Sequence, residues 1–285
     1  MPTSNPLPPA QIDELREVAE RVARRAGDLV RDGRPDRVEV AATKTSPQDV
    51  VTAMDLASEK LLRELLAVER PGDGVLGEEG GFTQGSTGIT WVVDPIDGTV
   101  NYLYGLANYS VMVAAVVTPD GGEPDPATWT VLAGCVHAPG DGRTFTAGLG
   151  AGAWFGDRRL RIDEPGPLDL CLVGTGFGYR RQARELQGAV LAELLPQVRD
   201  IRRLGSAGLD LCTLASGGLD LFFERGLRPW DLAAPSLVVT EAGGVITGLR
   251  GRPAGEVMTV AGHRARVGEL QGILERTGAD APLEG

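Results

Sequence analysis

The sequence predicts a layered fold of helices and sheets, α+β in its first half and α/β in its second. Two observations lead to this fold class. Short strand candidates crowd the middle of the chain between flanking amphipathic helices, and from about Leu168 strands and helices alternate. Both patterns are typical of sheets covered by helices. We therefore expect one domain over residues 10–285, comprising an α+β subdomain at 10–165 and an α/β subdomain at 166–285.

The first half opens with two predicted helices. Residues 10–32 carry apolar side chains at helical spacing and end near Gly33, and a second helix is predicted from about Ala53 to Val68. The side chains of this second helix expected to face inward are Leu61, Leu62 and Leu65. The strands expected next are 75–76, 89–93, 110–117, 131–137 and 143–147, with an exposed loop at 118–128 and a glycine-rich hairpin at 148–162.

The second half alternates strands with helices. Its predicted strands are 170–177, 219–224 and 258–262. Its predicted helices are 182–195, a helix from about Ser206, 231–242 and 264–276.

Composition excludes several classes of protein. The net charge is −11 and no Lys/Arg-rich stripe interrupts it, so nucleic acid is not an expected partner. No apolar stretch approaches the ~20 residues that span a bilayer, and the first ten residues lack a signal pattern, so we expect a cytoplasmic protein without membrane contact. The widely spaced Cys135, Cys171 and Cys212 are expected to be buried free thiols.

Acidic residues collect where predicted elements end. Glu78 and Glu79 follow one strand, Asp94 and Asp97 follow the next, and Asp231 lies at a helix start. Separately, they are explained by a solvated loop, a β-turn and a helix N-cap. If they converge, mutual repulsion and desolvation would raise their pKa values, so the acids could all stay ionised only with cations present. Mg²⁺ is the divalent ion that suits carboxylates plus a substrate phosphate.

The segment "DPIDGT" at 94–99 fits such a site. Two carboxylates straddle one turn, and the carbonyl of Ile96 between them is a further hard ligand. Gly98 allows the backbone to approach a phosphate, and Thr99 opens a helix whose free N–H groups favour an anion. Two ions ~3.5–4 Å apart would activate a water and stabilise the leaving oxygen of a phosphoryl group.

Several motifs together resemble the inositol monophosphatase family of Mg²⁺-dependent, lithium-sensitive phosphatases. The motifs are "KTSPQDVVTAMD" at 44–55, "GEEG" at 77–80, "WVVDPIDGTVNY" at 91–102, "LVGTGFGY" at 172–179, "RRLGSAGLDLC" at 202–212, and "WD" at 230–231 followed by "VVTEAGG". The resemblance runs from about Leu15 to Gln271. It implies five alternating layers, αβαβα, and a homodimer.

The resemblance also implies a metal set. Glu78, Asp94 and the Ile96 carbonyl would hold a first Mg²⁺, and Asp94, Asp97 and Asp231 a second, with Asp94 bridging. A third, weaker ion would rest on Glu78, with Glu79 in its outer shell, giving two to three ions in all.

Catalytic and substrate residues follow from the same resemblance. Thr99, oriented by Asp55, would polarise the nucleophilic water, so Asp55, Thr99 and Glu78 are the expected catalytic residues. The residues expected at the substrate are Ile96, Asp97, Gly98, Thr99, Gly205, Ser206, Ala207, Glu224 and Asp231. Among these, the amides of Gly98 and Thr99 would bind the phosphate, and 205–207 with Glu224 would face the alcohol. Lys44 matches a lysine on a loop that closes near the metals.

Three positions depart from the family pattern. Gly208 replaces a usual alanine and is expected to loosen a helix start. Pro235 is expected to be tolerated only if its nitrogen is among the first four of its helix. Arg228 adds a positive charge near the alcohol pocket and favours a substrate with a second anionic group.

The expected reaction is hydrolysis of a polyol monophosphate, inositol 1-phosphate first. "VNY" at 100–102 is closer to the inositol branch than to the nucleotide-bisphosphate branch. Histidinol phosphate, fructose 1,6-bisphosphate and nucleotide 3′-phosphates are alternative substrates. A regulatory protein on the same scaffold without catalysis is the alternative from a different class, and the intact acid set argues against it.

Overall fold

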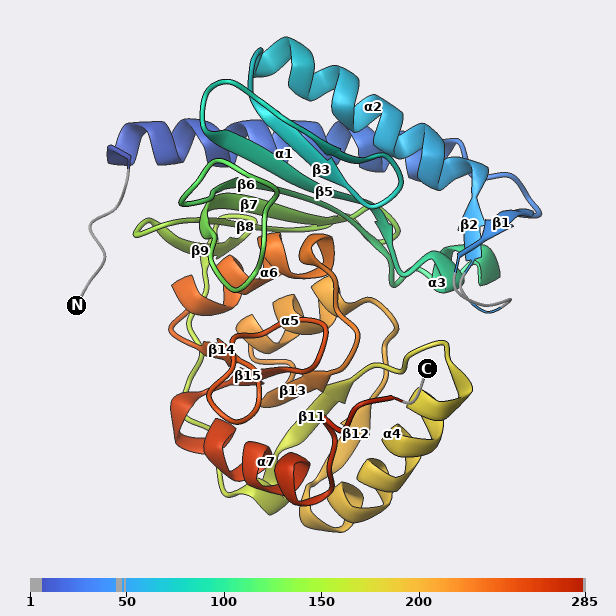
Figure 1. Cartoon of the computed structure of the whole chain (residues 1–285), viewed down its shortest axis with the longest axis vertical. Coiled ribbons are helices and arrows are strands. Elements are labelled where there is room, and N and C mark those ends of the chain that lie inside the picture. Colours follow the sequence, from blue (N-terminus) through green and yellow to red (C-terminus); the bar gives the residue numbers. More distant parts are fainter. Residues whose placement is uncertain (1–6, 45–47, 49, 284–285) are drawn as a thin grey trace.

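Helices and sheets alternate in five layers (Figure 1). The computed structural model describes residues 7–44, 48 and 50–283. In Figure 1, α1 and α2 cover one face of the larger sheet, α5 and α6 lie between the two sheets, and α4 and α7 cover the far face of the smaller sheet. The layered α and β architecture expected from the sequence is confirmed.

The helices are close to the predicted ranges. Their bounds are α1 Pro9–Asp32, α2 Ala53–Glu69, α3 Thr99–Tyr104, α4 Arg181–Leu194, α5 Ala207–Ala215, α6 Pro229–Glu241 and α7 Arg264–Arg276, with 3₁₀ turns at Leu168–Leu170 and Leu195–Gln197. In α2, Leu62 and Leu66 are the buried leucines, whereas Leu61 and Leu65 are half-buried. The inward face of α2 was therefore predicted correctly only at Leu62.

The larger sheet has the order β10-β9-β8-β7-β6-β5-β3-β4 in the described residues. Its strands are β3 Gly74–Gly77, β4 Gly81–Thr83, β5 Ile89–Asp97, β6 Ser110–Val117, β7 Thr130–Ala138, β8 Arg143–Gly148, β9 Gly152–Phe155 and β10 Arg158–Arg159. β3 and β5 are parallel neighbours. Their carboxyl ends therefore lie at the same edge, which brings the "GEEG" and "DPIDGT" segments together.

The smaller sheet has the order β12-β11-β13-β15-β14 in the same residues. Its strands are β11 Leu172–Thr175, β12 Asp200–Arg202, β13 Leu221–Glu224, β14 Val245–Thr247 and β15 Thr259–Gly262. A separate antiparallel pair is formed by β1 Val40–Thr43 and β2 Val50–Thr52. Strands β1, β2, β4, β12 and β14 were not predicted, because three or four residues give too short an alternating pattern.

Strand β5 continues past its predicted end. It runs through Asp97, and its pairing with β6 shifts register between Asp94 and Asp97. "DPID" is thus a bulged strand end and not the β-turn that its composition suggests. A bulge suits Pro95, which has no N–H for the ladder. The Pro95 carbonyl accepts a hydrogen bond from Ser58 of α2 at 3.0 Å.

Helix α6 begins two residues before the predicted start. Pro229 is its first residue, so Asp231 lies inside the first turn and not at the N-cap. Pro235 consequently lies inside the helix, beyond its first four nitrogens, so the condition under which a proline was expected to be tolerated there is not met. Proline there cannot donate to the carbonyl of Asp231, its partner four residues earlier.

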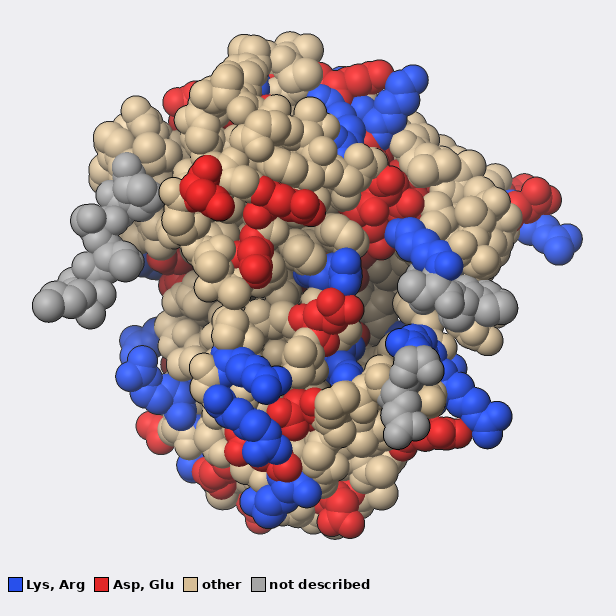
Figure 2. All heavy atoms as spheres, in the orientation of Figure 1, with Lys and Arg blue, Asp and Glu red and all other residues tan. Residues whose placement is uncertain are grey.

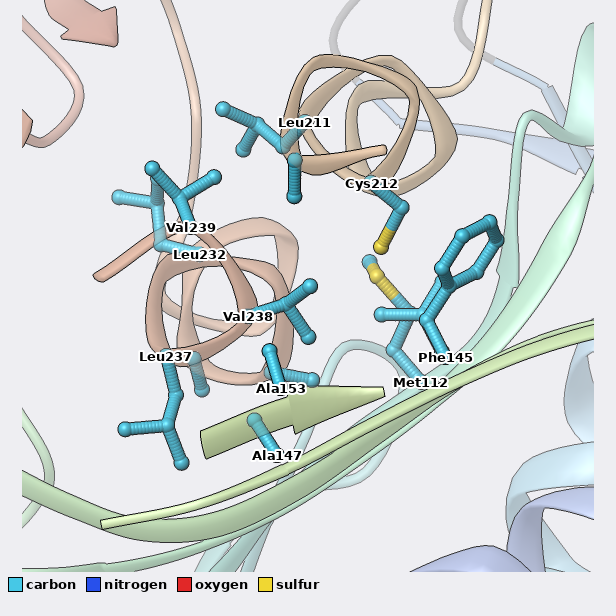
Figure 3. Close-up of a cluster of buried hydrophobic side chains, with 14 of the residues drawn as sticks. Met112, Phe145, Ala147, Ala153, Leu211, Cys212, Leu232, Leu237, Val238 and Val239 are labelled. Carbon is cyan, nitrogen blue, oxygen red and sulfur yellow. The ribbon is translucent and has the colours of Figure 1, made fainter. Parts of the chain in front are cut away.

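Buried side chains pack on both faces of the larger sheet. Figure 3 shows the core between this sheet and the helices α5 and α6, where Met112 and Phe145 face Cys212 and Val238. On the other face, α1 and α2 pack against a cluster that contains Trp91. Cys135, Cys171 and Cys212 are buried free thiols, as predicted.

Candidate active site

A cavity of about 800 Å³ opens between the two halves of the molecule. Figure 2 shows a hollow there, with acidic atoms along its upper border and basic atoms below it. The predicted site residues that line the cavity are Lys44, Glu78, Asp94, Ile96, Asp97, Gly98, Thr99, Gly205, Ser206, Ala207, Glu224, Arg228 and Asp231. Asp55 lies behind this lining and reaches it through Thr99. The structure therefore assembles residues that are more than 180 positions apart in the chain.

Three aspartates form the centre of the site. Oxygen atoms of Asp94, Asp97 and Asp231 all lie within 4.8 Å of one another. Burial and the neighbouring acids raise the pKa of Asp94 and of Asp231. None of the three forms an ion pair with a lysine or arginine in the part of the chain that the structure describes. Such a donor set, all oxygen and without a cationic side chain, fits divalent cations of the Mg²⁺ type.

Hydrogen bonds fix each aspartate. Asp94 accepts from the N–H of Ile96 at 3.0 Å, and Asp231 accepts from the N–H of Arg228 at 2.6 Å. Because both donors are backbone N–H groups, the main chain sets the orientation of both carboxylates. Both groups keep lone pairs free for the cavity.

Asp97 joins the two halves of the molecule. Its carboxylate accepts from the Ser206 hydroxyl at 2.5 Å, from the Gly208 N–H at 2.8 Å and from the Ala207 N–H at 3.2 Å. The start of α5 is thereby docked onto the end of β5, and an acid at a helix N-terminus is favourable. A Cβ on Gly208 would lie 2.3 Å from the Met112 sulfur, so glycine here makes room for Met112 rather than only loosening the helix.

Thr99 and Asp55 form the predicted pair. The Thr99 hydroxyl lies 3.0 Å from an Asp55 carboxylate oxygen and 3.0 Å from the Ile96 carbonyl. The other Asp55 oxygen accepts from the N–H and hydroxyl of Thr52 in a capping box. Gly98 has φ +93°, and a Cβ there would lie 3.0 Å from the carbonyl oxygen of Gly205. Glycine is therefore required for the segments around Gly98 and Gly205 to approach each other.

Glu78 lies in the cavity but is already paired. The Lys44 ammonium is 2.8 Å from Glu78 and 2.6 Å from Glu79. Burial raises the pKa of Glu78 to about 7, although Lys44 opposes the rise. Glu78 is not among the three acids within 4.8 Å of one another. Lys44 thus occupies the position beside Glu78 and Glu79 at which the resemblance implies a third ion.

Glu224 and Arg228, from the second half of the chain, also line the cavity. Glu224 packs so closely on Gly176 that a Cβ there has no room, and burial raises the pKa of Glu224 to about 8. Arg228 pairs with Glu256 at 2.9 Å and lies 5.6 Å from the centre of the Trp230 ring. The charge of Arg228 is therefore partly neutralised before any substrate arrives.

Two supporting residues were missed by sequence reasoning. Buried Glu59 of α2 accepts from the N–H groups of Glu79 and Gly80, both at 2.7 Å, and so shapes the "GEEG" loop. Asn101 donates to the carbonyls of Asn108 and Leu204 and ties α3 to the segment before α5. The signal for Glu59 was its spacing of four from Asp55, which places both acids on one face of α2.

The chain matches known proteins over nearly its whole length. The model of the inositol monophosphatase family matches residues 11–278. The chain belongs to the inositol monophosphatase family. Membership supports a phosphatase activity toward small phosphate esters, in a family that depends on Mg²⁺.

The individual relatives carry different names. "Inositol-1-monophosphatase SuhB" of Mycobacterium tuberculosis is 39% identical to this chain, and the match covers 94% of this chain and 96% of the relative. The solved structure of Mycobacterium tuberculosis SuhB superposes with a TM-score of 0.77, covering 94% of this chain and 98% of that one. "Nus factor SuhB" of Pasteurella multocida is 35% identical, covering 88% and 90%. The solved extragenic suppressor protein suhB of Bartonella henselae superposes with a TM-score of 0.81 at 30% identity, covering 92% and 99%.

Across residues 7–44, 48 and 50–283, every helix is too short or too polar to cross a bilayer.

Proposed function

We propose that the protein is a Mg²⁺-dependent phosphomonoesterase whose best substrate is inositol 1-phosphate. The observation that carries this proposal is the convergence of Asp94, Asp97 and Asp231 within 4.8 Å beside the hydrogen-bonded pair Thr99 and Asp55. A buried set of acids without cationic partners is costly unless it binds ions. A hydroxyl oriented by a carboxylate is a means of positioning a water molecule.

The metal set follows the resemblance. We assign Glu78, Asp94 and the Ile96 carbonyl to one Mg²⁺, and Asp94, Asp97 and Asp231 to a second. When bound, the ions supply positive charge that polarises the phosphoryl oxygens and lowers the pKa of a bound water. A third ion at Glu78 and Glu79 would have to displace the Lys44 ammonium from its contacts at 2.8 and 2.6 Å.

Thr99 and Asp55 handle the proton of the attacking water. The Thr99 hydroxyl has one proton and faces two acceptors, Asp55 and the Ile96 carbonyl. Its oxygen lone pairs therefore remain available to a water in the cavity. As that water loses a proton to the Thr99 oxygen, the Thr99 proton moves toward the Asp55 carboxylate. Asp55 is suited to this because its other oxygen is fixed by Thr52.

The remaining residues bind the two ends of the substrate. The N–H groups of Gly98 and Thr99 hold the phosphate, while Gly205, Ser206 and Ala207 line the alcohol side. Glu224 accepts hydrogen bonds from ring hydroxyls. Since these residues come from both halves, we propose that 10–165 and 166–285 work as one domain. We further propose a lithium-sensitive cytoplasmic homodimer, to be checked by light scattering and inhibition assays.

A panel of phosphate esters tests the substrate. Phosphate release is measured with inositol 1-phosphate, histidinol phosphate, fructose 1,6-bisphosphate and a nucleotide 3′-phosphate, each with Mg²⁺ and with EDTA. We expect the highest kcat/KM for inositol 1-phosphate and no release in EDTA. A higher kcat/KM for another ester would show that inositol 1-phosphate is not the best substrate, while the proposed phosphatase activity would stand.

The second candidate function is a regulatory role without catalysis. It is favoured by the name of the Pasteurella multocida relative, "Nus factor SuhB". That role predicts no release from any ester of the panel at any Mg²⁺ concentration. The same experiment therefore distinguishes the two candidates.

A further inference from the structure

The segment that follows α7 returns to the catalytic cavity. Figure 1 shows it turning back from the end of α7 toward the larger sheet. The helix ends at Arg276, and Gly278, in the left-handed conformation with φ +67°, allows the chain to turn there. Leu283 then lines the same cavity as Asp94. A residue far from the acid cluster in the sequence therefore belongs to the wall of the site.

Two arginines hold this segment in place. Arg225, the residue after β13, donates to the carbonyls of Ala279 at 3.1 Å and of Ala281 at 2.7 Å. Arg250, which follows β14, binds both carboxylate oxygens of Asp280, at 2.9 and 3.3 Å. Ala279 is itself buried in the core on this side of the smaller sheet. Three successive residues are thus fixed by side chains from two other parts of the fold.

Arg225 also belongs to the loop that carries the proposed substrate acid. Glu224 precedes Arg225, and both residues line the cavity. The next residue, Gly226, donates from its N–H to the carbonyl of Glu256 at 2.8 Å. The loop between β13 and α6 is therefore held by two partners, the connection between β14 and β15 and the segment after α7.

We propose that residues 278–283 form a fixed wall of the catalytic cavity and that Leu283 on this wall limits the size of the alcohol part of the substrate. This inference rests on the proposed phosphatase function and deepens it. The cavity of about 800 Å³ is roomy for a compact polyol, because sites for drug-sized ligands span about 300–1,000 Å³. An apolar side chain in its wall excludes bulk and offers no hydrogen bond, so Leu283 acts on size. Arg225 and Arg250 are its positioning residues.

The first test changes the size of the side chain at position 283 in both directions. The kcat/KM values for glycerol 2-phosphate, inositol 1-phosphate and adenosine 3′-phosphate are measured with Mg²⁺, since these esters differ mainly in the size of the alcohol. In Leu283→Ala the ratio of the adenosine value to the glycerol value should rise about threefold to tenfold, below the discrimination of an enclosed pocket because Leu283 is half-buried. In Leu283→Trp the ratio should fall by a similar factor. A general loss of stability lowers all values together and cannot give opposite shifts.

Arg250→Ala tests the anchoring. Arg250 lies outside the described lining of the cavity, so its substitution reaches the site through the segment that it holds at Asp280. The ratio should rise in Arg250→Ala, by less than in Leu283→Ala. Arg250→Lys, which keeps one charged donor, should restore part of the change.

Two control variants lie outside the segment. Arg181→Ala removes an ion pair with Glu185 at 2.8 Å, and Leu195→Ala shortens a leucine that is exposed by 52%. Both should leave the ratio at the wild-type value. They match the loss of an ion pair and the loss of a leucine side chain, respectively.

Thiol labelling examines the wall without catalysis. A cysteine introduced by Leu283→Cys can be labelled selectively, because the native thiols are all buried: Cys135, Cys171 and Cys212. N-ethylmaleimide should label this variant about twofold to fivefold faster when Arg250→Ala is added, as expected when loss of a partly exposed ion pair favours local opening.

The outcomes separate this inference from the proposed function. Opposite shifts of the ratio in Leu283→Ala and Leu283→Trp support the wall. Equal effects on all esters, or an unchanged ratio, overturn it while the phosphatase function stands. If the wild type hydrolyses none of the esters, the proposed function has failed, and the labelling rates decide about the wall: faster labelling with Arg250→Ala supports it, and equal rates overturn it.

Discussion

Asp210 is a buried acid that the proposed chemistry does not use. It lies in the first turn of α5 with 1% exposure, and one of its carboxylate oxygens has no hydrogen-bond partner among the described residues. Burial, and to a smaller extent the charge of Asp97, raise the pKa of Asp210 to about 8, while Arg203 opposes the rise. In the unfolded chain the pKa of an aspartate is near 4. The folded protein therefore binds a proton here that the unfolded chain releases.

The pKa difference at Asp210 predicts how stability depends on pH. The stabilisation that comes from protonated Asp210 in the folded protein is fully present below about pH 4. It is lost as the pH rises through about 8. Between pH 6 and pH 8 the free energy of unfolding should fall by about 2 kcal/mol through this group alone. Asp210→Asn cannot titrate, so its unfolding free energy should fall by about 2 kcal/mol less than that of the wild type.

Urea denaturation in EDTA at several pH values measures this difference. The exposed Asp163 provides the matched control, since Asp163→Asn should follow the wild type at every pH. Parallel curves for the wild type and Asp210→Asn would show that Asp210 stays ionised in the folded protein.

At the scale of elements, the turn between β5 and α3 sets the geometry of the site. Gly98 occupies it with φ +93°, and a Cβ there would lie 3.0 Å from the Gly205 carbonyl and 3.1 Å from the Asn108 carbonyl. Both neighbours are backbone, so they cannot rotate away as a side chain would. The turn therefore controls the distance between Thr99 and the start of α5.

Gly98→Ala tests this control. We expect the free energy of unfolding to fall by about 1–2 kcal/mol, because alanine is strained at a positive φ. We further expect kcat for inositol 1-phosphate to fall at least about tenfold, because small displacements of positioned groups are costly in catalysis. Gly88→Ala is the control: Gly88 has φ +86° but open space around its Cβ position. Equal kcat values in the two variants would show that the close approach at Gly98 is unimportant.

The sequence predicted the elements better than their contacts. Strand β6 and helix α7 have the predicted bounds because their apolar patterns are long and regular. The end of β5 was misjudged because Asp, Pro and Gly are also turn residues, and only the register with β6 reveals the bulge. The bonds from α5 to Asp97 span more than 100 residues of sequence, so no local pattern contains them.

The same limit applies to the charges of the site. The acids could be found because they lie near the ends of β3 and β5 and the start of α6, and the cavity brings them together. Which arginine is free for a ligand depends on partners elsewhere in the fold. Glu256 engages Arg228, and no pattern around "RPWD" predicts that pair.

At the scale of the whole molecule, the site lies where the two halves meet. β3 and β5 contribute acids from the larger sheet, and α6 contributes Asp231 from the second half. A net charge of −11 adds to the repulsion within this cluster. Divalent cations would therefore connect the two halves as well as serve the reaction.

Calorimetric titration with Mg²⁺ tests this account most directly, using the wild type, Asp94→Asn and Thr99→Ala, each also assayed for phosphate release. A neutral amide cannot supply the negative charge of the Asp94 carboxylate, so Asp94→Asn should lose both tight Mg²⁺ binding and turnover. Thr99→Ala should bind Mg²⁺ nearly as the wild type does, while its turnover falls by up to about 10²–10⁴-fold. Tight Mg²⁺ binding by Asp94→Asn, or equal loss of binding in both variants, would contradict the account.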